Sequence, residues 1–412
     1  MAEGPRGSGR VSDLWTSTRD AGLERMAAFQ PRMGRAYAAG RNTDFGPGRQ
    51  KAVSQLSPWV RRRLVTEEEL ARAALEAHGP RAAEKFVQEV IWRTYWKGWL
   101  ETRPEVWTRY QAERDAALEA VEANAGLRTA LTQAIEGRTG IEGFDDWARE
   151  LVETGWLHNH ARMWFASIWI FTLRLPWTLG ADVFLRHLMD GDPASNTLSW
   201  RWVAGLQTQG KTYLATASNI EQFTDGRFRP SGLARAAEPL SEAPVPAARP
   251  LPVAAGDVPD GPHLLLITAE DLSPESLIGP WEVAGVVQAS EPGAEGSGET
   301  ARSFLDGALD DAAARAEARY RQPVQRLAGL EPEGLIAAAT TAGVRTIVTA
   351  WAPVGPTAEA LARARPVLAA EGIALVQVRR RWDEALWPLA TKGFFPFKEK
   401  APAVLRTLGL PA

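Results

Sequence analysis

The chain has 412 residues, of which 45% are hydrophobic and 24% charged, and its net charge is −3. This composition is typical of a globular protein long enough for two domains. The chain has no cysteine and five histidines, which excludes disulfides, a thiolate nucleophile and cysteine-ligated clusters, and we expect no metal. No apolar run reaches the roughly 20 residues of a membrane span, and the first residues lack a signal-peptide core. We therefore expect a cytoplasmic protein without a membrane anchor.

Residues 1–230 are predicted to form an all-helical domain, because no segment in them alternates like a strand. Thr66 and Glu69 have the spacing of a capping box at the start of a helix over 66–78. Large apolar residues recur at helical spacing over 82–100. Further helices are expected at 105–123, 143–153, 156–174, 180–189 and 194–206.

Residues 231–262 are rich in Ala, Pro and Gly and are predicted to form an exposed linker. After them, short β-branched runs alternate with helical stretches, which favours an α/β domain with a mostly parallel sheet over 263–412. Strands are expected at 263–268, 281–289, 344–351 and 373–380, and helices at 303–320, 332–342 and 357–371. No glycine-rich nucleotide motif opens these helices. The aromatic segment 380–400 is expected to pack on the helical domain; the alternative is a cover over a chromophore pocket.

Two central stretches, 155–171 and 190–202, place polar side chains among tryptophans. A plain core needs apolar bulk, so polar groups in such company indicate a large planar ligand with polar edges. Arg162 needs an anion, and Asp190 is the expected partner; the alternative is a pair that only joins two helices.

Other residues in this half have a structural and a functional interpretation. Asp192 before Pro193 is typical of a helix N-cap, and Asn196 either is solvated or faces the same ligand as Arg162. Ser54 and Ser57 precede a helix and either cap it or hold a phosphate. Glu89 and Arg93, four residues apart, are a surface ion pair or part of the site. Arg61, Arg62, Arg63, His160 and Lys211 either form a solvated basic face or contact a phosphate backbone.

Taken in order, these motifs resemble the FAD-binding catalytic domain of the photolyase/cryptochrome family over residues 37–205. The matching pieces are Tyr37, VSQLSP (53–58), EVIWRTYW (89–96), EGRTG (136–140), TGWLHNHARM (154–163) and DGDPASNTLSWRW (190–202). The resemblance implies an all-helical domain that holds FAD in a bent form. Tyr37 and the 54–57 segment would contact the diphosphate, and Asn196 would face flavin N5. The implied cofactor residues are Tyr37, Ser54, Gln55, Leu56, Ser57, Phe86, Arg93, Trp156, Asn159, Arg162, Asp190, Asp192 and Asn196.

The resemblance also implies light-driven electron transfer from reduced FAD to a cyclobutane pyrimidine dimer in damaged DNA. Glu89, Trp92, Met163 and Trp202 match the family's lesion pocket. Trp200 and Trp177 match two tryptophans of its electron-transfer chain, and Trp107 is a candidate for the outermost one. The alternatives are a cryptochrome-like blue-light receptor that acts on a signalling partner without repair, and a relative that binds no flavin.

Three features depart from the family pattern. The α/β domain follows the helical domain, as if the order were swapped. The helical domain ends soon after Trp202, and His160 stands where typical dimer photolyases have arginine. The α/β domain resembles the family's antenna domain only in its alternation of strands and helices, so a second antenna chromophore stays unknown.

Overall fold

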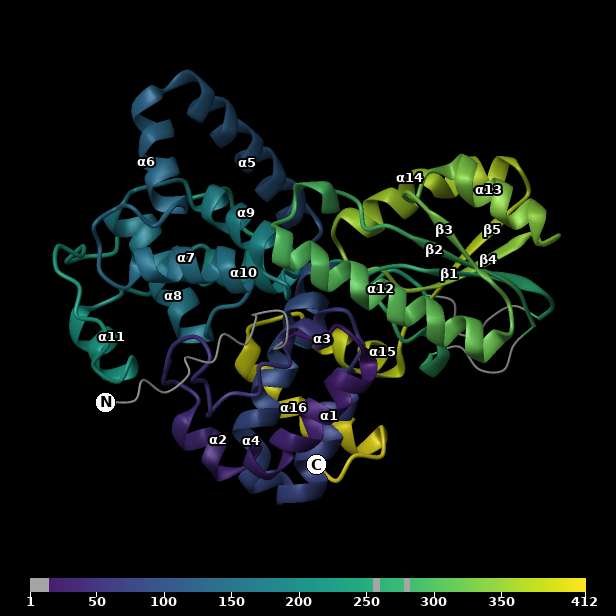
Figure 1. The fold of residues 1–412 in the computed structure, drawn as a ribbon, viewed down its shortest axis with the longest axis horizontal. Helices are drawn as coiled ribbons and strands as arrows, with labels where there is room; N and C mark the ends of the chain where they lie inside the picture. The colour runs from purple at the N-terminus through teal and green to yellow at the C-terminus, as the bar shows by residue number, and fades with distance from the viewer. Residues whose placement is uncertain (1–14, 255–259, 278–281) are drawn as a thin grey trace, which may run out of the picture.

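The computed structural model describes residues 15–254, 260–277 and 282–412, and its ribbon is shown in Figure 1. Within the described residues before 255 every regular element is helical, as expected. The α-helices are α1 (Arg19–Phe29), α2 (Arg35–Gly40), α3 (Ser57–Arg61), α4 (Glu67–Glu101), α5 (Glu105–Ala123), α6 (Ala125–Ile135), α7 (Phe144–Thr154), α8 (Asn159–Ser167), α9 (Trp177–His187), α10 (Pro193–Val203) and α11 (Ala217–Phe223). Among the described residues, no helix is long and apolar enough to cross a membrane.

Helix α4 joins two predicted helices into one element with a kink. Thr66 and Glu69 form the predicted capping box, since Glu69 N donates to Thr66 Oγ1 at 3.2 Å and Thr66 N to Glu69 Oε2 at 2.8 Å. The kink lies at Gly79, whose φ of 69° only glycine adopts at little cost, directly before Pro80. This kink separates the first turns of α4 from the half that bears the candidate site residues.

The predicted helix over 156–174 is shorter in the structure. Gly155 is left-handed, with a φ of 65°, and His158 caps the helix by accepting a hydrogen bond from His160 N at 3.2 Å. Helix α8 therefore begins at Asn159, and after Ser167 the chain continues as a π-helical turn over Ile168–Thr172.

The second part of the chain forms a five-stranded, all-parallel sheet, which confirms the α/β expectation (Figure 1). The strand order is β3-β2-β1-β4-β5, with β1 (His263–Ile267), β2 (Val283–Ala289), β3 (Val324–Leu327), β4 (Thr346–Ala350) and β5 (Ala374–Val378). The helices between the strands are α12 (Glu299–Tyr320), α13 (Pro332–Thr341) and α14 (Pro356–Ala370). Strand β3 was missed, because its four residues are a half-exposed edge without an apolar run. Residue 281, in the predicted second strand, lies outside the described residues.

Both faces of the central strand β1 are covered, which explains its unbroken apolar sequence. Leu264 and Leu266 pack in the same core as α13 and α14. Leu265 and Ile267 share a core with α12 and with the helical part. Alternate side chains of one strand therefore join the sheet to two different layers.

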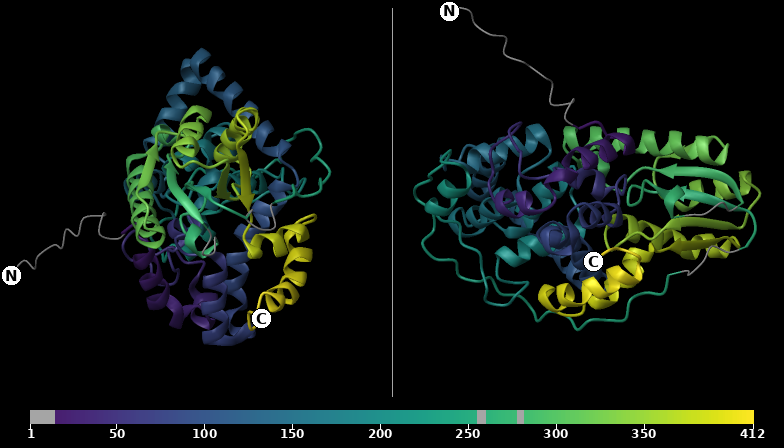
Figure 2. Two further views of the ribbon diagram at one scale, coloured as in Figure 1. Left: turned by 90° about the vertical axis from the view of Figure 1, so that its right-hand side faces the viewer. Right: turned by 90° about the horizontal axis from the view of Figure 1, so that it is seen from below.

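The aromatic segment after β5 packs on α4, as predicted, and forms α15 (Arg381–Leu386) and α16 (Phe394–Thr407) (Figures 1 and 2). Trp382 Nε1 donates to Thr94 Oγ1 at 2.9 Å, and Tyr95 OH donates to Lys392 O at 2.9 Å. Gly98 permits the closest approach, because a Cβ there would lie 2.8 Å from Trp387 Cα. The end of the chain thus adds helices to the helical part.

The predicted linker has no regular structure where it is described and is mostly exposed. It runs along the helical part: Leu240 N donates to Ala204 O at 3.0 Å and Arg249 N to Thr102 O at 2.8 Å. Glu242 pairs with the buried Arg201. Residues 255–259 lie outside the described residues.

Glu101, the last residue of α4, joins the helical part to the loop after β4. Its carboxylate is buried and accepts hydrogen bonds from Val354 N at 2.6 Å and Trp351 Nε1 at 3.3 Å. Burial raises the pKa of Glu101 to about 7, although these donors and Arg379 oppose the rise.

We expect Glu101→Gln to remove a pH dependence from the free energy of unfolding. Because the folded protein holds the Glu101 proton more tightly than the unfolded chain, wild-type stability falls as pH rises from about 4.5 to about 7, by about 1 to 3 kcal/mol. Urea unfolding at several pH values measures this slope in wild type, in Glu101→Gln and in the exposed control Glu119→Gln. A Glu101→Gln slope equal to that of wild type would rule out this assignment.

Candidate functional site

Arg162 and Asp190 form the predicted ion pair. Arg162 Nη2 donates to Asp190 Oδ2 at 2.9 Å, and Arg162 Nε donates to Leu157 O at 3.0 Å. Burial would raise the pKa of Asp190, but Arg162, Arg93 and Ser57 outweigh it and lower the pKa. The carboxylate is therefore ionised at neutral pH, on a side chain that is 2% exposed.

Asp192, two residues on, lies among three cations. Its Oδ1 accepts a hydrogen bond from Ser195 N at 2.7 Å, which confirms the predicted N-cap of α10. Its Oδ2 faces Lys97 Nζ at 3.4 Å, Arg93 Nη1 at 3.8 Å and Arg61 Nε at 3.9 Å. Burial would raise the pKa of Asp192, but these cations hold it well below its ordinary value.

Lys97 is a site residue that the sequence analysis missed. It lies one turn after Arg93 on α4, its side chain is 1% exposed, and its ammonium points to Asp192. The spacing of four residues from Arg93 was the available signal. Lys97 Nζ, Arg93 Nη1 and Asp190 Oδ1 are buried and have no hydrogen-bond partner in the described part of the chain. Because buried polar atoms rarely lack partners, this cluster suits a polar ligand.

The 54–57 segment lies against the same cluster. Trp156 Nε1 donates to Ser57 Oγ at 3.3 Å, which joins the start of α3 to the turn before α8. Arg25 of α1 donates to Ser54 O and to Gln55 Oε1, both at 2.8 Å, and so holds the turn in which Gln55 has a φ of 53°. The turn is fixed by side chains from α1 and from residue 156. Leu56, between them, is buried.

Tyr37 and Phe86 pack edge to face, with ring centroids 5.1 Å apart, on α2 and α4. One turn further along α4, Glu89 Oε1 lies 3.7 Å from Arg41 Nε. Burial raises the pKa of Glu89, although Arg41 and Lys85 oppose the rise. The predicted surface pair of Glu89 with Arg93 is not formed, because Arg93 turns to Asp192.

The two amides expected at one ligand have different surroundings. Asn196 is buried and its Nδ2 donates to Ala181 O at 2.8 Å. Asn159 begins α8 and is exposed. The structure therefore fixes the orientation of Asn196 but leaves Asn159 open to solvent.

Trp200 and Trp177 lie in the helical core. Trp200 packs edgewise on Phe184, with centroids 5.2 Å apart, and on Gly180, where a Cβ would lie 2.3 Å from its ring. Trp177 packs on Tyr110 at 5.6 Å, and Tyr110 packs on Trp107 at 5.2 Å. Tyr110, which the sequence analysis did not consider, therefore lies between Trp177 and Trp107.

The remaining aromatic candidates each meet a ring that the sequence analysis did not assign to a site. Trp202 stacks on Tyr213 with centroids 5.7 Å apart. Trp92 stacks on Phe394 of α16 with centroids 3.4 Å apart and an interplanar angle of 9°. Met163 is partly buried on α8. For the Trp92–Phe394 contact, the available sequence signal was the pair of phenylalanines at 394 and 395.

Residues 86–228 match the family model described as the FAD binding domain of DNA photolyase. This region of the chain is similar to the photolyase/cryptochrome family. This match confirms the expected FAD-binding type of domain, and the matched residues contain the Arg162–Asp190 pair and Asp192 with Arg93 and Lys97. The cofactor contacts of single residues stay predictions.

Curated relatives match part of the chain. A "Deoxyribodipyrimidine photo-lyase" of Streptomyces griseus is 38% identical over 159 residues, which are 38% of this chain and 33% of that protein. One from Thermus thermophilus is 32% identical over 203 residues, 49% of this chain and 46% of that protein. The chain thus spans between a third and a half of the length of these relatives. A crystal structure of a class III photolyase from Agrobacterium tumefaciens is 25% identical, with a TM-score of 0.43 over 54% of this chain and 46% of that one.

The structure overturns the expectation that Arg61, Arg62 and Arg63 form a solvated or DNA-contacting face. All three side chains are buried, because the α/β part supplies their carboxylate partners. The nearest pairs are Arg61 with Glu270 at 2.8 Å, Arg62 with Glu291 at 2.6 Å and Arg63 with Asp383 at 2.5 Å. Charges already paired in this way are not free to neutralise phosphates.

His160 and Lys211 differ from the arginines. His160 Nδ1 lies 3.0 Å from Asn42 O, its Nε2 lies 3.2 Å from Tyr213 OH, and its ring stacks on Trp164. Burial lowers the pKa of His160, so the ring is mostly neutral at pH 7. Lys211 is exposed. DNA contact by these two residues stays a prediction.

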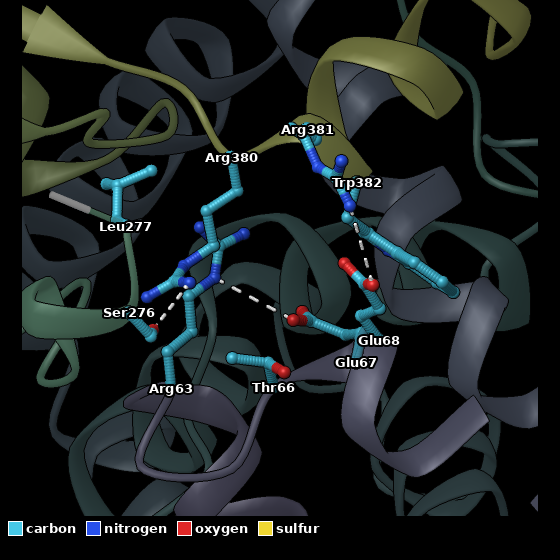
Figure 3. Close-up of a pocket in the computed structure, with 9 residues that line it drawn as sticks. All are labelled: Arg63, Thr66, Glu67, Glu68, Ser276, Leu277, Arg380, Arg381 and Trp382. Atoms are coloured by element: carbon cyan, nitrogen blue, oxygen red, sulfur yellow. Dashed lines mark hydrogen bonds and ion pairs between the residues drawn. The ribbon is translucent and has the colours of Figure 1, made fainter. Parts of the chain in front are cut away.

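A cavity of about 370 Å³ lies between the start of α4 and the segment that joins β5 to α15 (Figure 3). Its charged lining residues pair with one another or with buried carboxylates, as the contacts of Arg63 with Glu67 and of Arg381 with Glu68 show. None of the residues predicted for the cofactor or the lesion lines this cavity; of the predicted DNA-contacting residues, only Arg63 does.

Proposed function

We propose that this protein is an FAD-dependent photolyase that splits cyclobutane pyrimidine dimers in DNA with light. The observation that carries the proposal is the buried cluster of the Arg162–Asp190 pair and Asp192 with Arg93 and Lys97. All of these residues lie inside the region that matches the FAD-binding family model. The curated relatives named above are photo-lyases by name.

The residues of the cluster suit an anionic cofactor with polar edges. Arg93 and Lys97 offer buried donors without hydrogen-bond partners among the described residues, and Asp190 Oδ1 offers an acceptor. When bound, reduced FAD would supply the light-driven electron that opens the dimer. Arg162 and Asp190 would hold and orient the ring system, and the 54–57 turn with Tyr37 would bind the diphosphate.

The lesion would be recognised by a second set of residues on α4, α8 and α10. Burial favours the protonated form of Glu89, which would donate a hydrogen bond to the base edges of the dimer. Trp92, Met163 and Trp202 would form the apolar walls around a flipped-out dimer. Trp200 and Trp177 would conduct electrons through the helical core, with Trp107 as the outer donor.

The domain arrangement is part of the proposal. Residues 1–230 would be the FAD-binding domain, 231–262 the linker, and 263–412 an α/β domain that follows instead of preceding it. The packing of α15 and α16 on α4 supports this order, because helices from the end of the chain then complete the early helical domain.

A cryptochrome-like light receptor is the second candidate. The observation that favours it is the Trp92–Phe394 stack, which covers one wall of the proposed lesion pocket. Such a protein would use the same FAD site and signal to a partner protein without repair.

The deciding experiment is an absorbance spectrum followed by a repair assay. Purified protein loaded with FAD should show flavin bands, and under blue light with a reductant it should restore thymines in an oligonucleotide that carries one cyclobutane dimer. A dark sample is the control. Bound, reduced flavin without any dimer splitting in light would reject the repair proposal and favour the receptor.

A further inference from the structure

Phe394 occupies the face of Trp92 that a flat ligand would need. The two rings are nearly parallel, at 9°, with centroids 3.4 Å apart, which leaves no space for a third ring between them. Phe394 is 4% exposed. Trp96 and Tyr95 approach the same indole at 5.2 and 5.6 Å, and Trp92 stays partly buried.

The stack is held in place by the first turn of α16. Tyr95 packs edgewise on Phe394 at 5.4 Å and donates its hydroxyl proton to Lys392 O at 2.9 Å. One turn further, Lys398 Nζ lies 2.7 Å from Glu84 Oε1 on α4. These contacts place Phe394 over Trp92 as a defined conformation of the protein.

The same turn has features that permit movement. Its N-cap is Gly393, which offers no side chain to the free helical N–H groups. Phe395 is 73% exposed, and Lys392 and Pro396 are exposed as well, so the turn is attached on one side only. A rotation about Gly393 would carry Phe394 off Trp92 without disturbing the sheet.

We propose that Phe394 is a plug that competes with a flipped-out pyrimidine dimer for Trp92. This inference rests on the proposed function. One ring face stacks on one partner at a time, so dimer-containing DNA binds only the state in which the first turn of α16 has moved. The apparent affinity is then reduced by the fraction of molecules in the open state.

The first test compares Phe394→Ala with Phe395→Ala, which removes a phenylalanine ring one position along the same turn. Binding of a single-stranded oligonucleotide with one thymine dimer is measured in the dark. We expect Phe394→Ala to bind about tenfold more tightly than wild type, the scale of one lost aromatic stack, and Phe395→Ala to bind within about twofold. Equal or weaker binding by Phe394→Ala overturns the plug.

A second measurement does not depend on that variant folding well. In wild type, hydrogen exchange at the amides of residues 393, 394, 395 and 397 should become faster when the oligonucleotide is bound. In the otherwise cysteine-free chain, Glu84→Cys with Lys398→Cys, joined by a bifunctional thiol reagent, should lose binding that the unjoined variant retains. Unchanged exchange together with full binding by the joined protein contradicts the proposal.

The outcome is separable from that of the proposed function. If wild type splits dimers but Phe394→Ala gains no affinity, only the plug fails. If neither wild type nor Phe394→Ala binds the oligonucleotide, the plug is also rejected, while the FAD spectrum and light-dependent assay judge the repair proposal by themselves.

Discussion

Replacing Asp192 by alanine is expected to lower the free energy of unfolding by about 3 to 5 kcal/mol, because a buried ion cluster then loses the carboxylate that its cations share. Lys97 and Arg93 would remain buried beside the gap, and α10 would lose its cap. Urea unfolding of the apoprotein measures the loss, and FAD retention of the variant is measured alongside.

The stability that Asp192 contributes should depend on pH in a defined direction. The pKa of Asp192 is depressed in the folded protein, so its contribution is present above its ordinary pKa near 4 and is lost as pH falls below that value. The difference in the free energy of unfolding between wild type and Asp192→Ala should therefore become smaller at acidic pH. Asn124→Ala, which removes the exposed N-cap of α6, is the matched control and should cost about 1 kcal/mol. An Asp192→Ala loss no larger than the control would show that the cluster contributes no stability.

Replacing Arg63 by alanine should lower the free energy of unfolding about as much as Asp192→Ala does, because Arg63 joins the helical part to the α/β part. Arg63 Nη2 lies 2.5 Å from Asp383, and its other nitrogens lie 3.5 Å from Asp271 and 3.7 Å from Glu67. Without the guanidinium, the buried carboxylates of Asp383 and Glu67 lose their shared cation, while Asp271 keeps Arg380. Such a loss costs about 3 to 5 kcal/mol. The cost should shrink at acidic pH, because burial raises the pKa of Asp383 and its carboxylate then takes up a proton.

Arg381→Ala is the control for Arg63→Ala, because Arg381 lines the same cavity but is 76% exposed and lies 4.0 Å from Glu68 (Figure 3). Its removal should change the free energy of unfolding by no more than about 0.5 kcal/mol. A double-mutant cycle with Asp383→Ala measures the Arg63–Asp383 coupling. Equal losses in the free energy of unfolding for Arg63→Ala and Arg381→Ala would contradict the view that the burial of Arg63 makes its ion pairs important for stability.

Local pattern was enough to predict the two-part architecture. The change from a period of 3.6 to short β-branched runs marks where helices give way to the sheet, because side-chain direction follows backbone geometry. The caps at Thr66 and Asp192 were also predictable, since each uses a hydrogen bond to an amide three residues away. The edge strand β3 was not, because an exposed edge needs no apolar run.

Part of the candidate site could be predicted in the same way. Arg162 and Asp190 are only 28 residues apart and lie on neighbouring elements, and an arginine among tryptophans needs an anion. Lys97 was missed because a lysine on a helix is normally exposed. Its burial depends on Asp192, which reaches it only when α10 packs against α4.

By itself, the sequence determined the helical and α/β parts, the ordered motifs of the family and the Arg162–Asp190 pair. Only the tertiary structure decided that Arg61, Arg62 and Arg63 are buried, because their partners lie about two to three hundred residues away. It also decided that Phe394 covers Trp92, a contact between α4 and the end of the chain. Burial and long-range pairing depend on how whole elements pack, and no local spacing of residues encodes them.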